Sequence, residues 1–190
     1  MESVKTVLLI MGSTRASRVC PQVAAWVAGI GRACTEFVYE VVDLASWPLP
    51  MDDEPGIPAM GSYVQAHTLA WSDKIKSADA VIFVTPQYNW GYPAILKNAI
   101  DHLYHEWRAK PVMIVTYGGH SGDKCGHQLE QVAAAVKMSL VATSPGLVLP
   151  EDVIRKGASL DPDRDFDRHR DAVRNALMEL ATQIEGVNPS

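Results

Sequence analysis

Three aromatic rings, two amides and a glycine lie together in residues 86–93, which read PQYNWGYP and which we name the elbow. Asn89 belongs to a residue type that tolerates unusual turn dihedrals, and its amide offers both donors and acceptors to the edge of a heterocycle. Tyr88 and Trp90 carry rings that can cover a flat ligand. The alternative is that these rings pack in the core or at a subunit contact, which is the usual fate of a single tryptophan. The whole combination favours a flat ligand rich in heteroatoms.

A second segment, residues 12–18, reads GSTRASR and is named here the hydroxyl loop. Its hydroxyl groups and its two guanidinium groups are typical of an anion site between a strand and a helix N-terminus. It matches neither GxxxxGK[ST] nor GxGxxG, so neither Mg-nucleotide hydrolysis nor a Rossmann dinucleotide pocket is favoured. Taken alone, the segment is as well explained by a polar turn.

The third segment, residues 117–123, reads YGGHSGD and is named the glycine loop. Gly118 and Gly119 permit close approach of the backbone to a ligand, and their amides can stabilise negative charge that develops on it. His120 could donate a proton to a quinone oxygen, although a solvent-facing loop histidine is the simpler interpretation. The three segments together predict a flavin as the flat ligand, with the glycine loop near N1 and O2 of its ring.

Continuous apolar runs precede all three segments, at residues 7–11, 81–84 and 112–115. Such runs are typical of strands that are covered on both faces, and a parallel α/β sheet binds its ligand just beyond the carboxyl ends of such strands. Further strands are expected at 37–44 and, more weakly, at 146–149. Apolar residues at helical spacing predict five helices. The apolar positions run from Val23 to Cys34, from Leu96 to Trp107 and from Leu129 to Leu140. They also run from Val64 to Ile75 in a helix over 64–77, and from Phe166 to Ile184 in a helix over 165–185.

This alternation of strands and helices predicts an α/β fold, a flavodoxin-like three-layer sandwich. Its five-stranded parallel sheet would have the order 2-1-3-4-5, with helices on both faces. Residues 47–62, with four prolines and two glycines, are expected to form an ordered surface loop. Residues 150–163 are expected to be a polar segment. At 190 residues the chain is expected to be one domain, residues 1–190.

Composition excludes several classes of function. The net charge of -5 and the scattered lysines and arginines give no reason to expect nucleic acid or an anionic membrane. Three distant cysteines without a CxxC pair argue against a disulfide framework or a zinc site and fit a reducing compartment. No signal core and no run of about 20 apolar residues is present. We therefore expect a cytoplasmic protein with no metal ligands.

Several motifs resemble the NADPH-dependent FMN reductase family, which has a flavodoxin-like fold and includes quinone, azo and chromate reductases. The resemblance rests on GSTR at 12–15, on PQYNWGYP followed by LKNAID at 96–101, and on YGG at 117–119. It extends to DEP at 53–55, HT at 67–68, WS at 71–72, AD at 78–79, EW at 106–107 and KP at 110–111. The elbow pattern running into LKNAID is highly specific, whereas GSTR and GG alone are not.

The resemblance implies roles for each segment. The hydroxyl loop would hold the FMN phosphate through Ser13, Thr14, Arg15 and Arg18, residues 87–90 would lie along the ribityl chain and the isoalloxazine, and Gly118 and Gly119 would lie at the pyrimidine end. The cofactor-binding set that we expect is Ser13, Thr14, Arg15, Ser17, Arg18, Pro86, Gln87, Tyr88, Asn89, Trp90, Tyr117, Gly118, Gly119, His120 and Gly122, with no catalytic side chain.

Two features depart from the family pattern. Many relatives carry a serine where Arg18 stands, and their third loop is usually richer in glycine than this one, which Ser121 and Asp123 interrupt. The added carboxylate would weaken flavin binding or shift its potential.

The predicted function is ping-pong hydride transfer from NADPH or NADH through FMN to quinones, azo compounds, free flavin or metal ions. The alternative is a flavin-binding redox sensor or interaction protein with incidental turnover. A one-electron carrier of the flavodoxin type has only the acidic residues 52–54 in its favour, and a hydrolase lacks the GxSxG motif. The resemblance implies a homodimer or a dimer of dimers. Trp47, Trp90 and Trp107 are candidates for its contact surface, and each could equally belong to the core.

Overall fold

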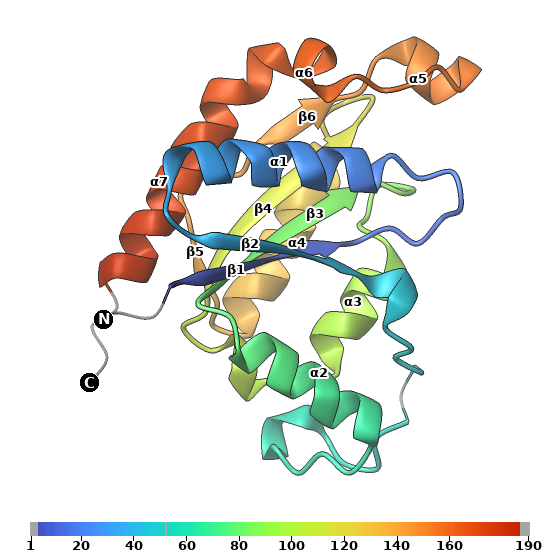
Figure 1. Ribbon diagram of the computed structural model, residues 1–190. Coiled ribbons are helices and arrows are strands. Elements are labelled where there is room, and N and C mark those ends of the chain that lie inside the picture. Colours follow the sequence, from blue (N-terminus) through green and yellow to red (C-terminus); the bar gives the residue numbers. More distant parts are fainter. Residues whose placement is uncertain (1–3, 52, 187–190) are drawn as a thin grey trace.

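The computed structural model describes residues 4–51 and 53–186, and a parallel sheet forms its centre (Figure 1). The strands are β1 (Thr6–Met11), β2 (Val38–Asp43), β3 (Ala80–Pro86), β4 (Pro111–Gly118), β5 (Ser139–Leu140) and β6 (Gly146–Val148). Their order is β2-β1-β3-β4-β5, with β6 also paired to β4, and every pairing is parallel. The predicted flavodoxin-like order is confirmed.

The fifth position of the sheet is shared by two short strands rather than filled by one. β5 pairs with the start of β4, and β6 pairs with its end. Between them the chain leaves the sheet, because the backbone amide and hydroxyl of Thr143 both donate to the carboxylate of Glu179, at 2.8 and 2.6 Å. The prediction of a single weak strand at 146–149 therefore found only the second of the two.

Helices cover both faces of the sheet (Figure 1). One face is covered by α1 (Cys20–Cys34) and α7 (Arg170–Gly186), and the other by α2 (Ala66–Lys76), α3 (Ala94–Asp101) and α4 (Asp123–Ala135). Alternation along the strands builds the two cores, since Val7 and Leu9 face α1 and α7 while Leu8 and Ile10 face the other layer. Burying each such side chain contributes about 1.5–3 kcal/mol.

The second helix begins later than its sequence pattern indicates. Val64 was predicted to lie on its apolar face, but it precedes the helix and is 61% exposed. The cause is Glu54, whose carboxylate accepts hydrogen bonds from the backbone amides of Val64 and Gln65, both at 3.0 Å. These contacts hold the chain extended up to Gln65, the N-cap of α2.

The C-terminal part of the chain differs most from the predicted elements. The segment 150–163 contains a helix, α5 (Glu151–Lys156), and the predicted helix 165–185 is divided into α6 (Pro162–Asp165), a 3-10 turn and α7. The division follows Phe166, which is fully buried and leaves helical geometry with φ -112°. The predicted fourth helix ends at Ala135, so Leu140 lies in β5, and α3 ends at Asp101, before the buried Leu103 and Trp107.

Candidate functional site

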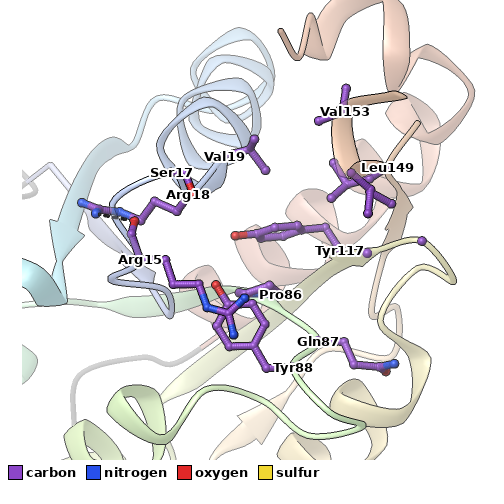
Figure 2. A pocket seen from close by; sticks show the side chains of 13 residues that line it. Arg15, Ser17, Arg18, Val19, Pro86, Gln87, Tyr88, Tyr117, Leu149 and Val153 are labelled. Carbon is purple, nitrogen blue, oxygen red and sulfur yellow. Dashed lines mark hydrogen bonds between the residues drawn. The ribbon is translucent and has the colours of Figure 1, made fainter. Parts of the chain in front are cut away.

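A pocket of about 320 Å³ opens where β1, β3 and β4 end, and all three predicted loops contribute to it (Figure 2). This size falls at the lower end of small-molecule sites. The residues that line it are Arg15, Ser17, Arg18, Val19, Pro86, Gln87, Tyr88, Tyr117, Gly118, Gly119, Leu149, Val153 and Ile154. We name Arg15, Ser17, Arg18 and Tyr88 the polar wall, and Leu149, Val153 and Ile154 the apolar wall.

The polar wall joins the hydroxyl loop to the elbow. Ser13 is fully buried beneath the rim, and its hydroxyl lies 2.6 Å from the hydroxyl of Tyr88. The guanidinium of Arg15 lies over the ring of Tyr88, 3.5 Å from its centroid, where a cation interacts favourably with the aromatic face. Thr14 is exposed and does not line the pocket. Two segments about 75 positions apart in the sequence are thus fixed to each other at the edge of the pocket.

Arg18 carries the strongest indication of the ligand's chemistry. Its Nη2 donates to the carboxylate of Asp43 at 2.6 Å, and its Nη1 donates to the carbonyl of Arg15 at 3.1 Å. Its Nε is buried and has no hydrogen-bond partner within the described residues. Next to it lies Val19, the N-cap of α1, which provides no side-chain cap, and free amides at a helix start favour an anion. An unpaired guanidinium N–H beside a helix N-terminus fits a phosphate group.

The elbow is a tight turn with unusual backbone geometry. Asn89 and Trp90 have φ values of 48° and 73°, and the amide and carbonyl of Tyr88 pair with those of Gly91 at 2.8 and 3.0 Å. Two successive positive φ angles are typical of a type I′ turn and cost of order 1–3 kcal/mol each outside glycine. The turn directs Asn89 and Trp90 outward: both are exposed, Trp90 by 65%, and neither lines the pocket.

Gln87 and Gly122 shape the glycine loop. The side-chain oxygen of Gln87 accepts hydrogen bonds from the amides of Lys124 and Cys125, at 3.1 and 3.2 Å, and so caps α4. Gly122 has φ 75°, and a Cβ there would lie 2.9 Å from Cβ of Thr116, so this position requires glycine. Gly118 and Gly119 consequently face the pocket, whereas His120 is exposed outside it.

Tyr117 lines the pocket and contacts the buried Cys20, and neither has the pKa of an acid or base that works near neutral pH. Burial raises the pKa of Tyr117 far above its ordinary value, and the neighbouring Cys20 thiol raises it further. Burial likewise raises the pKa of Cys20, against the opposing effect of its contact with Tyr117. Both groups stay protonated at neutral pH, so their part is to shape the pocket.

The sequence analysis missed the apolar wall, together with Val19. Val153 and Ile154 belong to α5, which faces the glycine loop so closely that a Cβ on Gly119 would lie 3.3 Å from Cδ1 of Ile154. The local signals for α5 were available in the sequence: Glu151 and Asp152 in its first turn, and Gly157, with φ 66°, after its last.

Comparison with known proteins adds an independent finding. The family model of the NADPH-dependent FMN reductases matches residues 5–148. An NAD(P)H-dependent FMN reductase of Schizosaccharomyces pombe is 52% identical over 185 residues, which cover 96% of this chain and 92% of that protein. A quinone reductase of Pseudomonas putida is 31% identical, with 86% of this chain and 84% of that protein covered.

A solved structure shares the fold. The flavoenzyme NAD(P)H:(acceptor) oxidoreductase FerB of Paracoccus denitrificans superposes with a TM-score of 0.73 at 19% identity, with 96% of this chain and 98% of that one covered. The motifs, the fold and the family match agree. The chain therefore belongs to the NADPH-dependent FMN reductase family, as its motifs predicted, and is an NAD(P)H-dependent oxidoreductase with FMN as its cofactor.

Proposed function

We propose that the protein, acting as a single reductase domain over residues 1–190, transfers hydride in a ping-pong cycle from NAD(P)H through FMN to a small oxidised acceptor. Arg18, which lines a pocket formed by three loops and has a buried Nε without a partner, is the observation that supports this proposal most directly. Bound FMN supplies the redox chemistry, and the chain binds and orients it. Donor and acceptor would use the same open side of the pocket in turn.

Each wall has a proposed task. Arg15, Ser17 and Arg18 would bind the phosphate, with Ser13 and Thr14 in the same loop. Pro86, Gln87 and Tyr88 would lie along the ribityl chain and the ring, with Tyr88 positioned by Ser13 and with the exposed Asn89 and Trp90 at the outer edge of the site. Amides of Gly118 and Gly119 would stabilise negative charge at the pyrimidine end, in a loop shaped by Tyr117, His120 and Gly122. The apolar wall would exclude water from the ring and contact the acceptor.

Quinones are the acceptor class that we propose first, because the relative in Pseudomonas putida is a quinone reductase. Azo compounds, free flavin and metal ions are the further acceptors of the proposal. The test is a visible spectrum of the purified protein before and after NADPH is added without oxygen. We expect a yellow preparation that bleaches and then recovers when a quinone is added. A protein that takes up no FMN, or that stays yellow with NADPH, would contradict the proposal.

Steady-state kinetics distinguish the reductase from a redox sensor. Parallel double-reciprocal plots, with turnover close to the rate of bleaching, support the ping-pong reductase. Fast bleaching followed by slow oxidation of NADPH with every acceptor on a panel would favour a sensor.

We also propose that the protein forms a homodimer or a dimer of dimers in the cytoplasm. Of the candidate tryptophans, Trp107 is fully buried, Trp47 packs on Trp71 with ring centroids 5.0 Å apart, and only Trp90 is largely exposed. Exposed apolar side chains instead gather before and along α2, at Met51, Ile57, Met60, Val64 and Leu69. Light scattering after gel filtration tests the assembly.

Three unpaired cysteines support a reducing compartment, and no helix within the described residues has the length and hydropathy to cross a bilayer.

A further inference from the structure

Three potential metal ligands lie together near α2 and α3, two helices that cover the same face of the sheet (Figure 1). Asp53 comes from the loop before α2, His67 from the first turn of α2, and His102 from the C-cap of α3. Their ligand atoms all lie within 4.8 Å of one another. None of the three lines the pocket.

Two of these side chains already contact each other. Nε2 of His67 lies 3.0 and 3.1 Å from the two carboxylate oxygens of Asp53, and both side chains are about one quarter exposed. The backbone around Asp53 is held as well, since its carbonyl accepts from Nε2 of Gln65 at 3.1 Å. A histidine–aspartate pair on a surface needs no metal to explain it.

His102 is the residue that the pair does not explain. His102 is only 6% exposed. Its Nε2 is buried and has no hydrogen-bond partner among residues 4–51 and 53–186. Leaving such a nitrogen unsatisfied in the folded protein is costly. The ring of His102 lies 5.8 Å from that of His67, so the two imidazoles face the same small space as the carboxylate.

We propose that Asp53, His67 and His102 bind one divalent transition-metal ion of the Zn²⁺ class. Two imidazoles and one carboxylate are suitable ligands for such an ion, whereas Ca²⁺ and Mg²⁺ prefer oxygen alone. Metal–ligand bonds of about 2.1 Å require ligand atoms roughly 3.4 Å apart, which side-chain rotation achieves from the present spacing. With three protein ligands, a fourth position stays open to water.

The electrostatic surroundings favour a cation. His102 lies at the C-terminal end of α3, where the helix dipole is negative, and the Glu54 carboxylate follows Asp53 directly in the chain. The ion would join the loop before α2 to both helices. Because α3 starts directly after the elbow and its eight residues span about 12 Å, the ion would also fix the far end of the helix that leaves the pocket.

The test uses the untagged, flavin-loaded protein after treatment with a chelator, and Zn²⁺ itself as the probe. Equilibrium dialysis with elemental analysis is expected to give one Zn²⁺ per chain at micromolar free Zn²⁺. Asp53→Asn and His67→Asn are expected to weaken this affinity by at least the roughly 10–100-fold that loss of a supporting group costs a metal site. His102→Asn should do the same, and the two partly exposed positions, Asp53 and His67, keep the test decisive if that buried variant does not fold.

Matched controls come from the same region and the same residue types. Asp101→Asn removes an exposed carboxylate that pairs with Lys97, and His127→Asn removes an exposed histidine on α4; both should keep full Zn²⁺ uptake. Co²⁺ in place of Zn²⁺ should give visible bands beyond the flavin absorption that the ligand variants lose. No uptake by the parent protein, or equal uptake by Asp53→Asn, His67→Asn and the parent, would overturn the proposal.

Discussion

The two walls of the pocket are built in opposite ways. The polar wall is tied to the sheet: Ser13 is buried and hydrogen-bonded to Tyr88, and Arg18 is paired with Asp43 at the end of β2. The apolar wall is formed largely by α5, a helix of six residues without a single buried one. The walls therefore differ in how far their side chains depend on the rest of the fold.

This difference indicates in which wall a substitution should cause little loss of stability. A change in the polar wall leaves a buried donor or acceptor without its partner, which is costly in a folded protein. A change in α5 removes apolar contact from a surface that water already reaches, and such changes are usually small in stability. We expect the polar wall to determine whether FMN binds, and the apolar wall to determine which acceptor is preferred.

The largest expected effect comes from Arg18→Ala. It removes the unpaired Nε and the partner of Asp43, and hydrogen bonds to charged groups contribute about 1.5–3 kcal/mol. We therefore expect FMN affinity to fall about 10–100-fold, measured by flavin fluorescence titration. Arg18→Lys keeps the charge but lacks Nε, so it should recover only part of the affinity. Arg32→Ala, at the other end of α1, is the control. Equal affinities for all four proteins would refute the role of the polar wall.

A smaller effect is expected from Tyr88→Phe, which leaves the buried hydroxyl of Ser13 without the partner seen at 2.6 Å. The free energy of unfolding should fall by about 1–3 kcal/mol, measured by urea denaturation of the FMN-free protein. Replacing both partners should be less harmful, so the double variant with Ser13→Ala should be more stable than the sum of the single changes indicates. Strict additivity of the two changes would show that the contact does not hold the loops together.

The stability of the protein at alkaline pH should depend on Cys125, which lies in α4 and donates its backbone amide to Gln87 of the elbow. Burial, with a smaller contribution from the charge of Asp123, raises the pKa of Cys125 from 9.0 to about 12. The thiol of the unfolded chain ionises from pH 9.0 upward, whereas the folded thiol stays protonated. The contribution of Cys125 to the free energy of unfolding is therefore fully present below pH 9.0 and is lost as pH rises towards 12. Denaturant unfolding at several pH values should show this fall, and Cys125→Ala should reduce its slope. An unchanged slope in that variant would show that Cys125 does not cause the fall, and would leave it to the other thiols and phenols whose pKa is raised, such as Cys20, Tyr92 and Tyr117.

The contrast between the walls also explains what the sequence could predict. The strands at 7–11, 81–84 and 112–115 are long buried apolar runs, and the loops that follow them must meet at one sheet edge, so the sheet order and the polar wall could be predicted. Asn89 and Trp90 were assigned to ligand contact, yet the I′ turn points them outward, because turn direction depends on backbone pairing within the turn.

The apolar wall could be derived only in part from local pattern, because residues such as Gly157 mark the ends of α5 but not its place in the fold. α5 is too short to show helical periodicity, and its position over Gly119 is set by β6, whose pairing with β4 is a tertiary contact. The proposed metal site at Asp53, His67 and His102 could not be predicted for a related reason, since no spacing rule joins residues that only folding brings within 4.8 Å.

The smallest expected effect in stability, and the sharpest test of the comparison, is Ile154→Ala. Ile154 is 50% exposed at the pocket, so the free energy of unfolding should change by less than about 0.5 kcal/mol and FMN affinity should hardly change. Loss of an apolar contact to the acceptor should raise KM for a small naphthoquinone about three- to tenfold. The rate constant for reduction of the flavin by NADPH should stay the same. Met178→Ala, which truncates a similarly exposed side chain on α7, is the matched control. If Ile154→Ala lowers FMN affinity as much as Arg18→Ala does, the two walls do not divide their tasks and both serve the cofactor.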